Sequence, residues 1–531
     1  MSNPTGRGAA VVIGAGIAGL TAAKSLSEAF DTVVVVDRDE LPVGGRPRRG
    51  VPQGQHSHVL LVAGQRALEE LFPGLGEELV AAGAQVFDSG ADLHLYRLGA
   101  AWNPVHSGQP FVSMSRPLLE YTIRRRVEAL PNVTVRPGTS VSGLGGTDGR
   151  VTEVLLDGER LAADLVVDTT GRGSRSDRWL AALGFPAPEV EEVKVNVGYV
   201  SRLYRHTPGD LAVKAAFVQP TPPAEKRIGA ALLIEDDQWL VSVGGWHRDY
   251  PAATEEGFLA HAESLPDPVI AKLVRQAEPL TEPVAFQYPA NRRRHFEELA
   301  EVPAGYLALG DAICSFNPLY GQGMTCAAQE ALALGRLLAE HEGVTADLAR
   351  AFYQEAAGVL FVPWQAAIGG DFDYAETVGR RPYAAELFGR YSTQAQLAAQ
   401  VSGEVRKVIL SVQHLLAPPM ALWEPSLTAE IVRAARHAPE GAQPEFGYGG
   451  HGRPLWTAED RDAERIRAAL RAAGLPEFSD RAPGFAVEGG APILVARLDG
   501  GDRNDYVEAI AGAGFTVAAD PADPTTLRVT A

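Results

Sequence analysis

Short apolar runs and a helical pattern alternate in the N-terminal part of the chain. Residues 9–13 form a continuous apolar run, residues 17–28 repeat apolar positions at helical spacing, and residues 32–36 form a second run. Strands that are buried on both faces read as continuous apolar runs, as in parallel sheets covered by helices. The pattern therefore predicts a β-α-β unit of an α/β domain.

Longer strand-like segments follow between residues 193 and 287. Those at 195–205, 213–219, 228–234 and 239–246 are bounded by turn residues. They predict a mostly antiparallel sheet inserted into the α/β domain. An interrupted strand-like stretch at 86–112 is assigned to the same sheet.

The C-terminal part is mostly helical in pattern from about 346 to 437 and becomes rich in Pro and Gly from about 438. Patterns beyond 457 predict a small α/β appendage. Its predicted helices are 458–473 and 502–511, and its strands are 493–497, 515–518 and 526–530. The predicted parts are an α/β domain at 1–190 and 293–345, the inserted sheet at 191–292, a helical region at 346–440, and the linker and appendage at 441–531.

Composition narrows the function classes. The net charge of −18 argues against nonspecific binding to nucleic acid or to anionic membranes. The two cysteines, Cys314 and Cys326, give no disulfide framework or zinc site, and we expect buried packing thiols in a reducing cytoplasm. No apolar run reaches the roughly 20 residues that a membrane helix needs.

The first glycine-rich segment, the early loop (14–19), has the spacing Gly14-x-Gly16-x-x-Gly19 between a predicted strand and a predicted helix. The three glycines serve a tight turn, close approach to a pyrophosphate and close packing of helix on strand. The phosphate then lies at a helix N-terminus. Asp37, at the end of the second strand, is the expected acceptor for a ribose hydroxyl.

A second glycine-rich segment, the late loop (310–324), also follows an apolar run and precedes a helical pattern. Asp311 is placed to bind a flavin ribityl hydroxyl, and a helix-capping or turn Asp is the alternative. Backbone N–H groups at 321–323 would stabilise negative charge on reduced flavin. Together the two loops predict FAD in a Rossmann-like domain.

These segments resemble the class A flavoprotein monooxygenases, which have the para-hydroxybenzoate hydroxylase fold with a GR2-type FAD domain. Residues 50–61 and 314–324 more closely resemble the bacterial branch that contains the polyether-type polyene epoxidases, relatives of squalene epoxidase. The resemblance covers residues from about 8 to 430. It implies an FAD-dependent monooxygenase whose flavin C4a-hydroperoxide epoxidises an olefin in an apolar polyketide or terpenoid intermediate.

The resemblance also implies that Arg116 contacts FAD and that NAD(P)H docks transiently as reductant. The family's middle motif falls at 164–174, where Thr170-Gly171 replaces the usual Asp-Gly, so nicotinamide binding stays open. The predicted cofactor-binding residues are Gly14, Gly16, Ile17, Ala18, Gly19, Asp37, Arg38, Arg46, Arg116, Gly171, Gly310, Asp311, Pro318, Gly321, Gln322, Gly323 and Met324.

Candidate substrate contacts are aromatic. An apolar cavity is predicted to involve Trp239, Trp246, Phe286, Tyr288, Phe316 and Trp364, with ordinary core positions as the alternative. His56 and His58 are weak candidates for a proton relay, against a structural role in a loop. The basic stretch at 46–49 either faces phosphate or NAD(P)H or is a solvated loop.

Several activities compete on this fold. Ring hydroxylation is the first alternative to epoxidation, and a double-bond reductase or a non-catalytic flavin-binding partner protein are others. Flavin halogenation is disfavoured, because no lysine stands between Lys24 and Lys194 and the Trp-x-Trp-x-Ile-Pro motif is missing. The expected partners are an apolar small molecule and molecular oxygen, with a docking role for the appendage left open.

Overall fold

The computed structural model describes residues 7–382, 385–438, 458–479, 482–490, 492–521 and 523–530. The chain divides into two compact units, one of Met1–Arg381 with Ala399–Glu430 and one of Pro382–Ala398 with Ile431–Ala531. Most of the predicted Pro/Gly-rich linker lies outside the described residues. The finer domain boundaries stay predictions.

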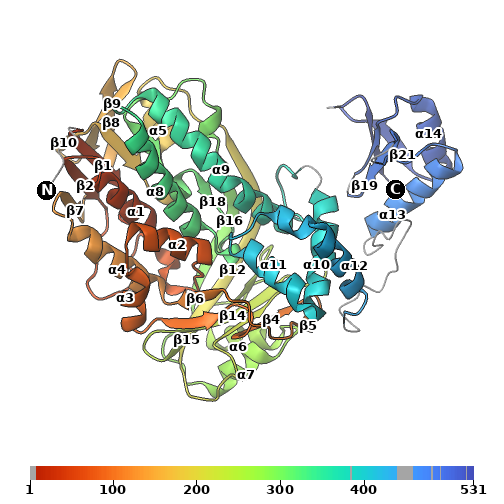
Figure 1. Cartoon of the computed structure of the whole chain (residues 1–531), viewed down its shortest axis with the longest axis horizontal. Helices are drawn as coiled ribbons and strands as arrows, with labels where there is room; N and C mark the ends of the chain where they lie inside the picture. The colour runs from red at the N-terminus through yellow and green to blue at the C-terminus, as the bar shows by residue number, and fades with distance from the viewer. Residues whose placement is uncertain are drawn as a thin grey trace. The chain divides into compact units, whose positions relative to one another are not determined.

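The first unit contains the predicted parallel sheet (Figure 1). Its strand order is β17-β11-β1-β2-β7, and every adjacent pair is parallel. All four residues of β11 are buried, as expected for a strand covered on both faces. The strands are β1 (Ala9–Ile13), β2 (Thr32–Val36), β7 (Val133–Arg136), β11 (Leu165–Asp168) and β17 (Tyr306–Ala308).

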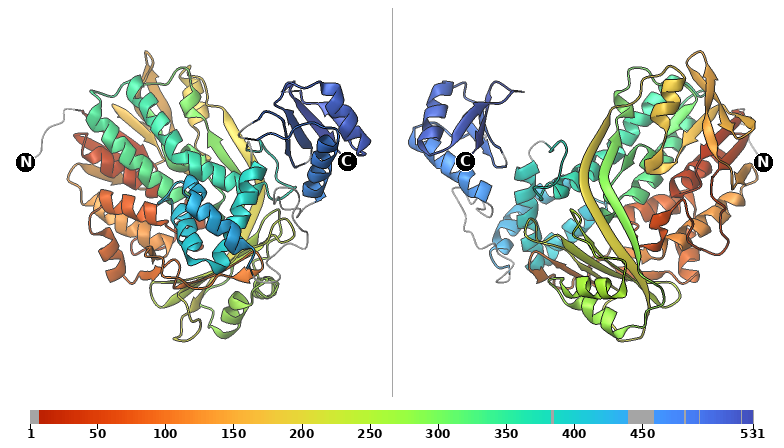
Figure 2. Two further views of the ribbon diagram at one scale, coloured as in Figure 1. Left: turned by 45° about the vertical axis from the view of Figure 1, so that its right-hand side comes forward. Right: turned by 180° about the vertical axis from the view of Figure 1, so that it is seen from behind.

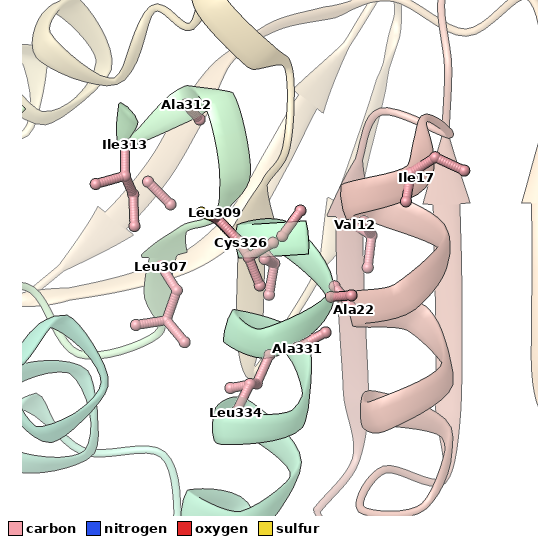
Figure 3. Close-up of a cluster of buried hydrophobic side chains, with 14 of the residues drawn as sticks. Val12, Ile17, Ala22, Leu307, Leu309, Ala312, Ile313, Cys326, Ala331 and Leu334 are labelled. Atoms are coloured by element: carbon pink, nitrogen blue, oxygen red, sulfur yellow. The ribbon is translucent and has the colours of Figure 1, made fainter. Parts of the chain in front are cut away.

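Two helices that begin at the glycine loops pack side by side on this sheet. They are α1 (Ile17–Ser27) and α8 (Gly323–Glu340). The hydroxyl of Ser25 donates to the carbonyl oxygen of Ala331 across their contact at 2.7 Å. Figure 3 shows Ala22 of α1 beside Ala331 of α8, with Leu334 one turn further along. The close approach fixes the two helix N-termini relative to one another.

The inserted sheet has eight strands in the order β18-β16-β12-β15-β14-β13-β4-β5. It is antiparallel except where β13 pairs with β4. The strands are β4 (Leu93–Arg97), β5 (Ala100–Ala101), β12 (Val190–Arg205), β13 (Ala215–Val218), β14 (Arg227–Ile234), β15 (Gln238–Gly245), β16 (Val284–Arg294) and β18 (Cys314–Ser315). Because β18 belongs to the late loop, the cofactor segment is itself the edge of this sheet.

Smaller elements complete the first unit (Figure 2). The stretch at 86–112 is divided, because β3 (Gln85–Asp88) and β6 (Pro110–Ser113) pair with each other instead of joining the large sheet. The predicted hairpin at Asp157-Gly158 is present as β9 (Arg150–Leu156) and β10 (Glu159–Ala162), with β8 (Val141–Thr147) beside β9. The helices include α2 (Val62–Leu71), α3 (Leu75–Ala81), α4 (Arg116–Glu128), α5 (Ser176–Ala182), α6 (Glu255–Glu263), α7 (Val269–Gln276), α9 (Ala346–Asp371) and α11 (Gly403–Gln413).

The second unit has its own hydrophobic core, which includes Ile466, Phe485, Tyr506 and Leu527. Its four-stranded sheet has the order β19-β20-β22-β21. The elements are α13 (Ala458–Ala472), β19 (Phe485–Glu488), β20 (Ile493–Arg497), α14 (Arg503–Gly512), β21 (Thr516–Ala519) and β22 (Thr526–Thr530). The sequence pattern missed β19. Helices α10 (Ala385–Val401) and α12 (Pro425–Ala435) each run from one unit into the other.

Across the described ranges, no helix has both the length and the apolar character needed to span a bilayer.

Candidate functional site

The early loop is a tight turn held by backbone contacts. The Gly14 N–H donates to the carbonyl oxygen of Val36 at 2.7 Å, and Gly14 has a φ of 109°. A Cβ atom at Gly19 would lie 1.8 Å from the carbonyl oxygen of Gly14. A side chain at position 19 therefore cannot fit without separating α1 from the loop, as the glycine spacing predicts.

The two glycine loops meet. A Cβ atom at Gly310, whose φ is 68°, would lie 2.8 Å from the Cβ of Ala18 in the first turn of α1. A Cβ atom at Gly323 would lie 3.3 Å from a carboxylate oxygen of Asp311. Neither α1 nor α8 has a side-chain cap or an acidic residue in its first turn. The site thus presents two uncapped helix N-termini, which favour an anionic ligand.

Asp311 lies between these helix starts in an enclosed setting. Burial raises the pKa of its carboxyl, while the guanidinium groups of Arg116 and Arg172 act in the opposite direction. A Cβ atom at Gly171 would lie 3.8 Å from the Cβ of Asp311. The structure therefore brings the predicted residues Gly171, Arg116 and Asp311 to one place.

Glu330 is a site residue that the sequence pattern did not reveal. It is fully buried in α8, and its Oε2 accepts the Gly310 N–H at 2.6 Å. Burial, together with the nearby Asp311 carboxylate, raises the pKa of Glu330 to about 8. The available signal was the single acidic residue in the mostly apolar stretch of 325–338.

An ion-pair network supports the early loop. Asp37 accepts the Ala15 N–H at 2.6 Å and pairs with Arg48 at 3.3 Å. Arg48 also pairs with Glu120 at 2.6 Å and with Asp39 at 2.9 Å. Burial alone would lower the pKa of Arg48, but Glu120 and Asp37 outweigh it and raise that pKa. Asp37 thus bonds to the loop backbone, while its ribose contact stays a prediction.

An open cavity of about 650 Å³ lies next to this network. It is bordered by the segment after β2 and by Ser140 beyond β7, so it lies at the carboxyl ends of two parallel strands, where ligands of α/β sheets bind. Arg38 and Arg48 line it, whereas Arg46 is exposed and does not. Asp39, Glu40 and Arg49 also line it, and Arg48 is already paired with carboxylates, so Arg38 and Arg49 are the basic side chains suited to the anionic part of a nucleotide.

Asp168 organises the middle motif. It accepts hydrogen bonds from the N–H and hydroxyl of Thr170, at 2.9 and 2.6 Å, and from the hydroxyls of Ser174 and Tyr306. Thr170 therefore stabilises the turn through its own backbone and side chain. Next to it, the guanidinium of Arg172 lies 4.6 Å from the ring centre of Tyr288.

Five of the six predicted aromatic residues belong to the core around the late loop, and the sixth does not. Trp246, Tyr288, Phe316 and Trp364 are buried in this core, and Phe286 packs against it. Trp239 belongs to a separate core beneath α6 and α7, and its indole donates to Asp210. Whether these side chains contact a substrate stays a prediction.

His56 and His58 have different environments. His56 is fully buried between the rings of Tyr199 and Phe286, and burial lowers its pKa to about 4. His58 faces a small void lined by Arg116 and Met324. Burial and Arg116 lower its pKa to about 3. Both imidazoles are therefore neutral near pH 7.

A chain of hydroxyl groups joins His56 to the inserted sheet. Its Nδ1 lies 2.7 Å from the Ser201 hydroxyl, which lies 2.5 Å from that of Ser242. The Ser242 hydroxyl lies 2.7 Å from that of Ser57. The Nε2 of His56 is buried and has no partner among the described residues. The arrangement leaves one ring nitrogen free for a ligand.

Comparison with known proteins identifies relatives. The model of the family described as FAD binding domain matches residues 8–351. The chain is 35% identical over 411 residues to Protein Rv3254 of Mycobacterium tuberculosis, covering 73% of this chain and 86% of that protein.

Solved structures with a similar fold are flavoproteins. One is a flavoprotein/dehydrogenase from Cytophaga hutchinsonii (TM-score 0.56, 16% identity, 82% of this chain and 99% of that chain). Another is PqsL from Pseudomonas aeruginosa, named a probable FAD-dependent monooxygenase (TM-score 0.53, 18% identity, 68% of this chain and 99% of that chain). A third is a triple mutant of the flavin-dependent brominase Bmp2 (TM-score 0.51, 14% identity, 80% of this chain and 93% of that chain). At these identities the likeness establishes the fold.

The residues of the site fit the dinucleotide FAD. Two glycine turns leave helix N-termini open, and the Nε of Arg116 and the Oε1 of Gln322 are buried without partners among the described residues. Buried polar atoms are normally paired, so the Arg116 Nε–H is suited to donate a hydrogen bond to a bound ligand and the Gln322 Oε1 to accept one.

Proposed function

The chain belongs to the FAD binding domain family and has the fold of FAD-dependent monooxygenases, and on this premise we propose that it epoxidises an olefin in an apolar natural-product intermediate. One observation carries the proposal. The late loop supplies β18, which pairs with β16 of the large sheet, so aromatic side chains of that sheet stand beside the cofactor segment. Among them, the hydroxyl of Tyr288 donates to Ser315 at 3.2 Å.

Bound FAD, reduced by NAD(P)H, supplies the activation of molecular oxygen. The chain's own residues bind the cofactor, exclude water and orient the substrate. Trp246, Phe286 and Tyr288 offer apolar surface, and epoxidation needs no strong general base. We propose NAD(P)H as a reductant that docks transiently, because no second Gly-x-Gly-x-x-Gly segment follows a strand pattern.

The test begins with the purified protein and its visible spectrum. Candidate polyenes and aromatics are then supplied with NAD(P)H and ¹⁸O₂, and products are analysed by mass spectrometry. Epoxidation predicts one labelled oxygen atom in an olefinic substrate. Product formed without oxygen would instead identify a double-bond reductase, and a colourless protein that cannot be reconstituted with FAD would contradict the cofactor.

Ring hydroxylation is the second candidate, and the buried His56 chain favours it. A phenol is more reactive toward an electrophilic oxygen once it is ionised, so its hydroxylation benefits from a base. Because burial lowers its pKa to about 4, His56 does not hold an added proton well, so a phenolic proton accepted at Nε2 requires the Nδ1 proton to leave in the same step. The Ser201 and Ser242 hydroxyls are suited to pass that proton to half-buried Ser57 and from there to solvent. A labelled phenolic product would decide for this reaction.

A further inference from the structure

We propose that Asp371, the last residue of α9, is a positioning residue that holds the late loop in the shape required to bind FAD. The matched family region ends at residue 351, and Asp371 lies 20 residues beyond it. The proposal rests on FAD binding alone, and not on which substrate is oxygenated.

Asp371 is a fully buried carboxylate that accepts four hydrogen bonds. Its Oδ1 accepts from the Trp246 indole N–H at 2.8 Å, the Asn317 amide at 2.9 Å and the Tyr320 hydroxyl at 3.1 Å. Its Oδ2 accepts from the Asn291 amide at 2.6 Å. Two of the four donors belong to the late loop, and the other two come from the large sheet and its end. These bonds use most of the acceptor capacity of the group.

All four donors are neutral. Burial raises the pKa of Asp371, and the four hydrogen bonds act against that shift. A buried charge that lacks an opposite charge is tolerated only when hydrogen bonds compensate it. The hydrogen bonds that Asp371 requires therefore fix the positions of Asn317 and Tyr320 relative to the end of α9.

Further contacts give the same loop a single orientation. The side-chain oxygen of Asn291 accepts the backbone N–H of Asn317, so the Asn291 amide group is directed at Asp371. The rings of Phe316 and Trp364, the latter also on α9, lie 6.5 Å apart. The segment before the cofactor-facing residues 321–323 is thus held at three residues, Phe316, Asn317 and Tyr320.

Gly370 provides the space in which Tyr320 reaches Asp371. A Cβ atom at Gly370 would lie 2.6 Å from the Tyr320 hydroxyl oxygen, whereas a Cβ atom at Gly369 would meet nothing within 4 Å. Both residues lie in α9, where alanine is intrinsically more favourable than glycine. The pair offers a perturbation of the loop and a control with the same chemical change.

The experiment compares Gly370→Ala with Gly369→Ala in the full-length protein. Dissociation constants for FAD are measured by flavin fluorescence titration of apoprotein, and apoprotein melting temperature is measured alongside. We expect Gly370→Ala to weaken FAD binding by about tenfold or more, as for a lost hydrogen bond to a charged group, with the melting temperature unchanged or raised. Gly369→Ala should bind FAD as the unaltered protein does.

A second comparison removes the clash. Replacing Tyr320 by Phe in the Gly370→Ala background deletes the atom that a methyl group would strike, so the two changes should weaken binding less than additively. Equal FAD affinity in Gly370→Ala and Gly369→Ala would overturn the proposal, as would a fall in melting temperature that accounts for the loss. Failure of the unaltered protein to bind FAD would instead contradict the cofactor assignment.

Discussion

The early and late loops are both glycine turns between a parallel strand and a helix, but they are held in different ways. The early loop is fixed by contacts with the ends of the neighbouring parallel strands: the Gly14 N–H donates to Val36, Asp37 accepts the Ala15 N–H, and the Thr169 hydroxyl donates to the carbonyl oxygens of Ile13 and Gly14. The late loop depends on side chains from other elements, including Glu330 in α8 and Asp371 in α9. The early loop is therefore held from the sheet on which it lies, whereas the late loop also depends on side chains of two helices that follow it in the chain.

The largest expected effect comes from breaking the early loop. Gly19→Ala places a methyl group against the carbonyl oxygen of Gly14, and backbone cannot move aside cheaply. We expect a destabilisation of about 2–4 kcal/mol and loss of bound FAD. Urea unfolding and FAD content after purification measure the two. Gly173→Ala is the control, since a Cβ there meets nothing within 4 Å, and equal behaviour of the two variants would contradict the backbone-held picture.

A residue in neither loop should affect turnover without affecting FAD affinity. His56→Phe preserves the aromatic contacts with Tyr199 and Phe286 but removes the acceptor nitrogen. For a phenolic substrate we expect kcat to fall roughly 10²–10³-fold, the usual worth of a positioned base, and for an olefin to change little. Steady-state kinetics with both substrate types measure this. A weakened FAD affinity would instead make the residue part of the cofactor site.

The late loop should carry a pH dependence that the early loop lacks. The pKa of Glu330, raised to about 8, means that the folded state keeps its proton at pH values where the unfolded chain releases it. Stability from this group is complete below about pH 4.5 and is lost as pH rises through 8. Glu330→Gln should flatten that decline, by an amount on the order of a few kcal/mol. Urea unfolding from pH 5 to about 9 measures it.

His295 provides the control for this titration. Its ring nitrogens pair with Glu191 at 3.3 Å and Glu297 at 3.1 Å, which raise its pKa to about 9. Its contribution is complete below about pH 6.5 and is lost as pH rises through 9, so it should persist in Glu330→Gln and vanish in His295→Gln. Below pH 6.5 the fall of the unfolding free energy with pH should come from Glu330. If that fall were the same in Glu330→Gln as in the unaltered protein, the buried carboxyl would not be its source.

The smallest effect is expected from truncation. Residues 458–530 contribute to a core of their own, and their removal would break the ion pair between Arg390 and Asp460. Ending the chain at residue 440 should therefore leave FAD affinity and turnover within about twofold. Unchanged values would assign the C-terminal segment a role with a partner or in stability, whereas loss of FAD would make it part of the cofactor site.

The same contrast explains what the sequence could predict. Local patterns predict the early and late loops as flavin-binding segments, and they predict the mostly antiparallel sheet. Glu330 and Asp371 did not, because their hydrogen bonds join elements that only the folded chain brings together. Strand β16 (Val284–Arg294) was not predicted as a strand, and it ends in the basic run Arg292, Arg293 and Arg294. In the structure Arg294 is buried and donates to the carbonyl oxygens of Ala312 and Ser174.

The pairing of β18 with β16 has a consequence for protein engineering. In this pairing Arg292 lies opposite Ser315 and Arg293 lies opposite Cys314, so the cofactor segment is part of the inserted sheet. A chimera that exchanges this sheet for that of a relative needs crossover points outside 284–324, because a junction between the two strands would separate hydrogen-bonded partners.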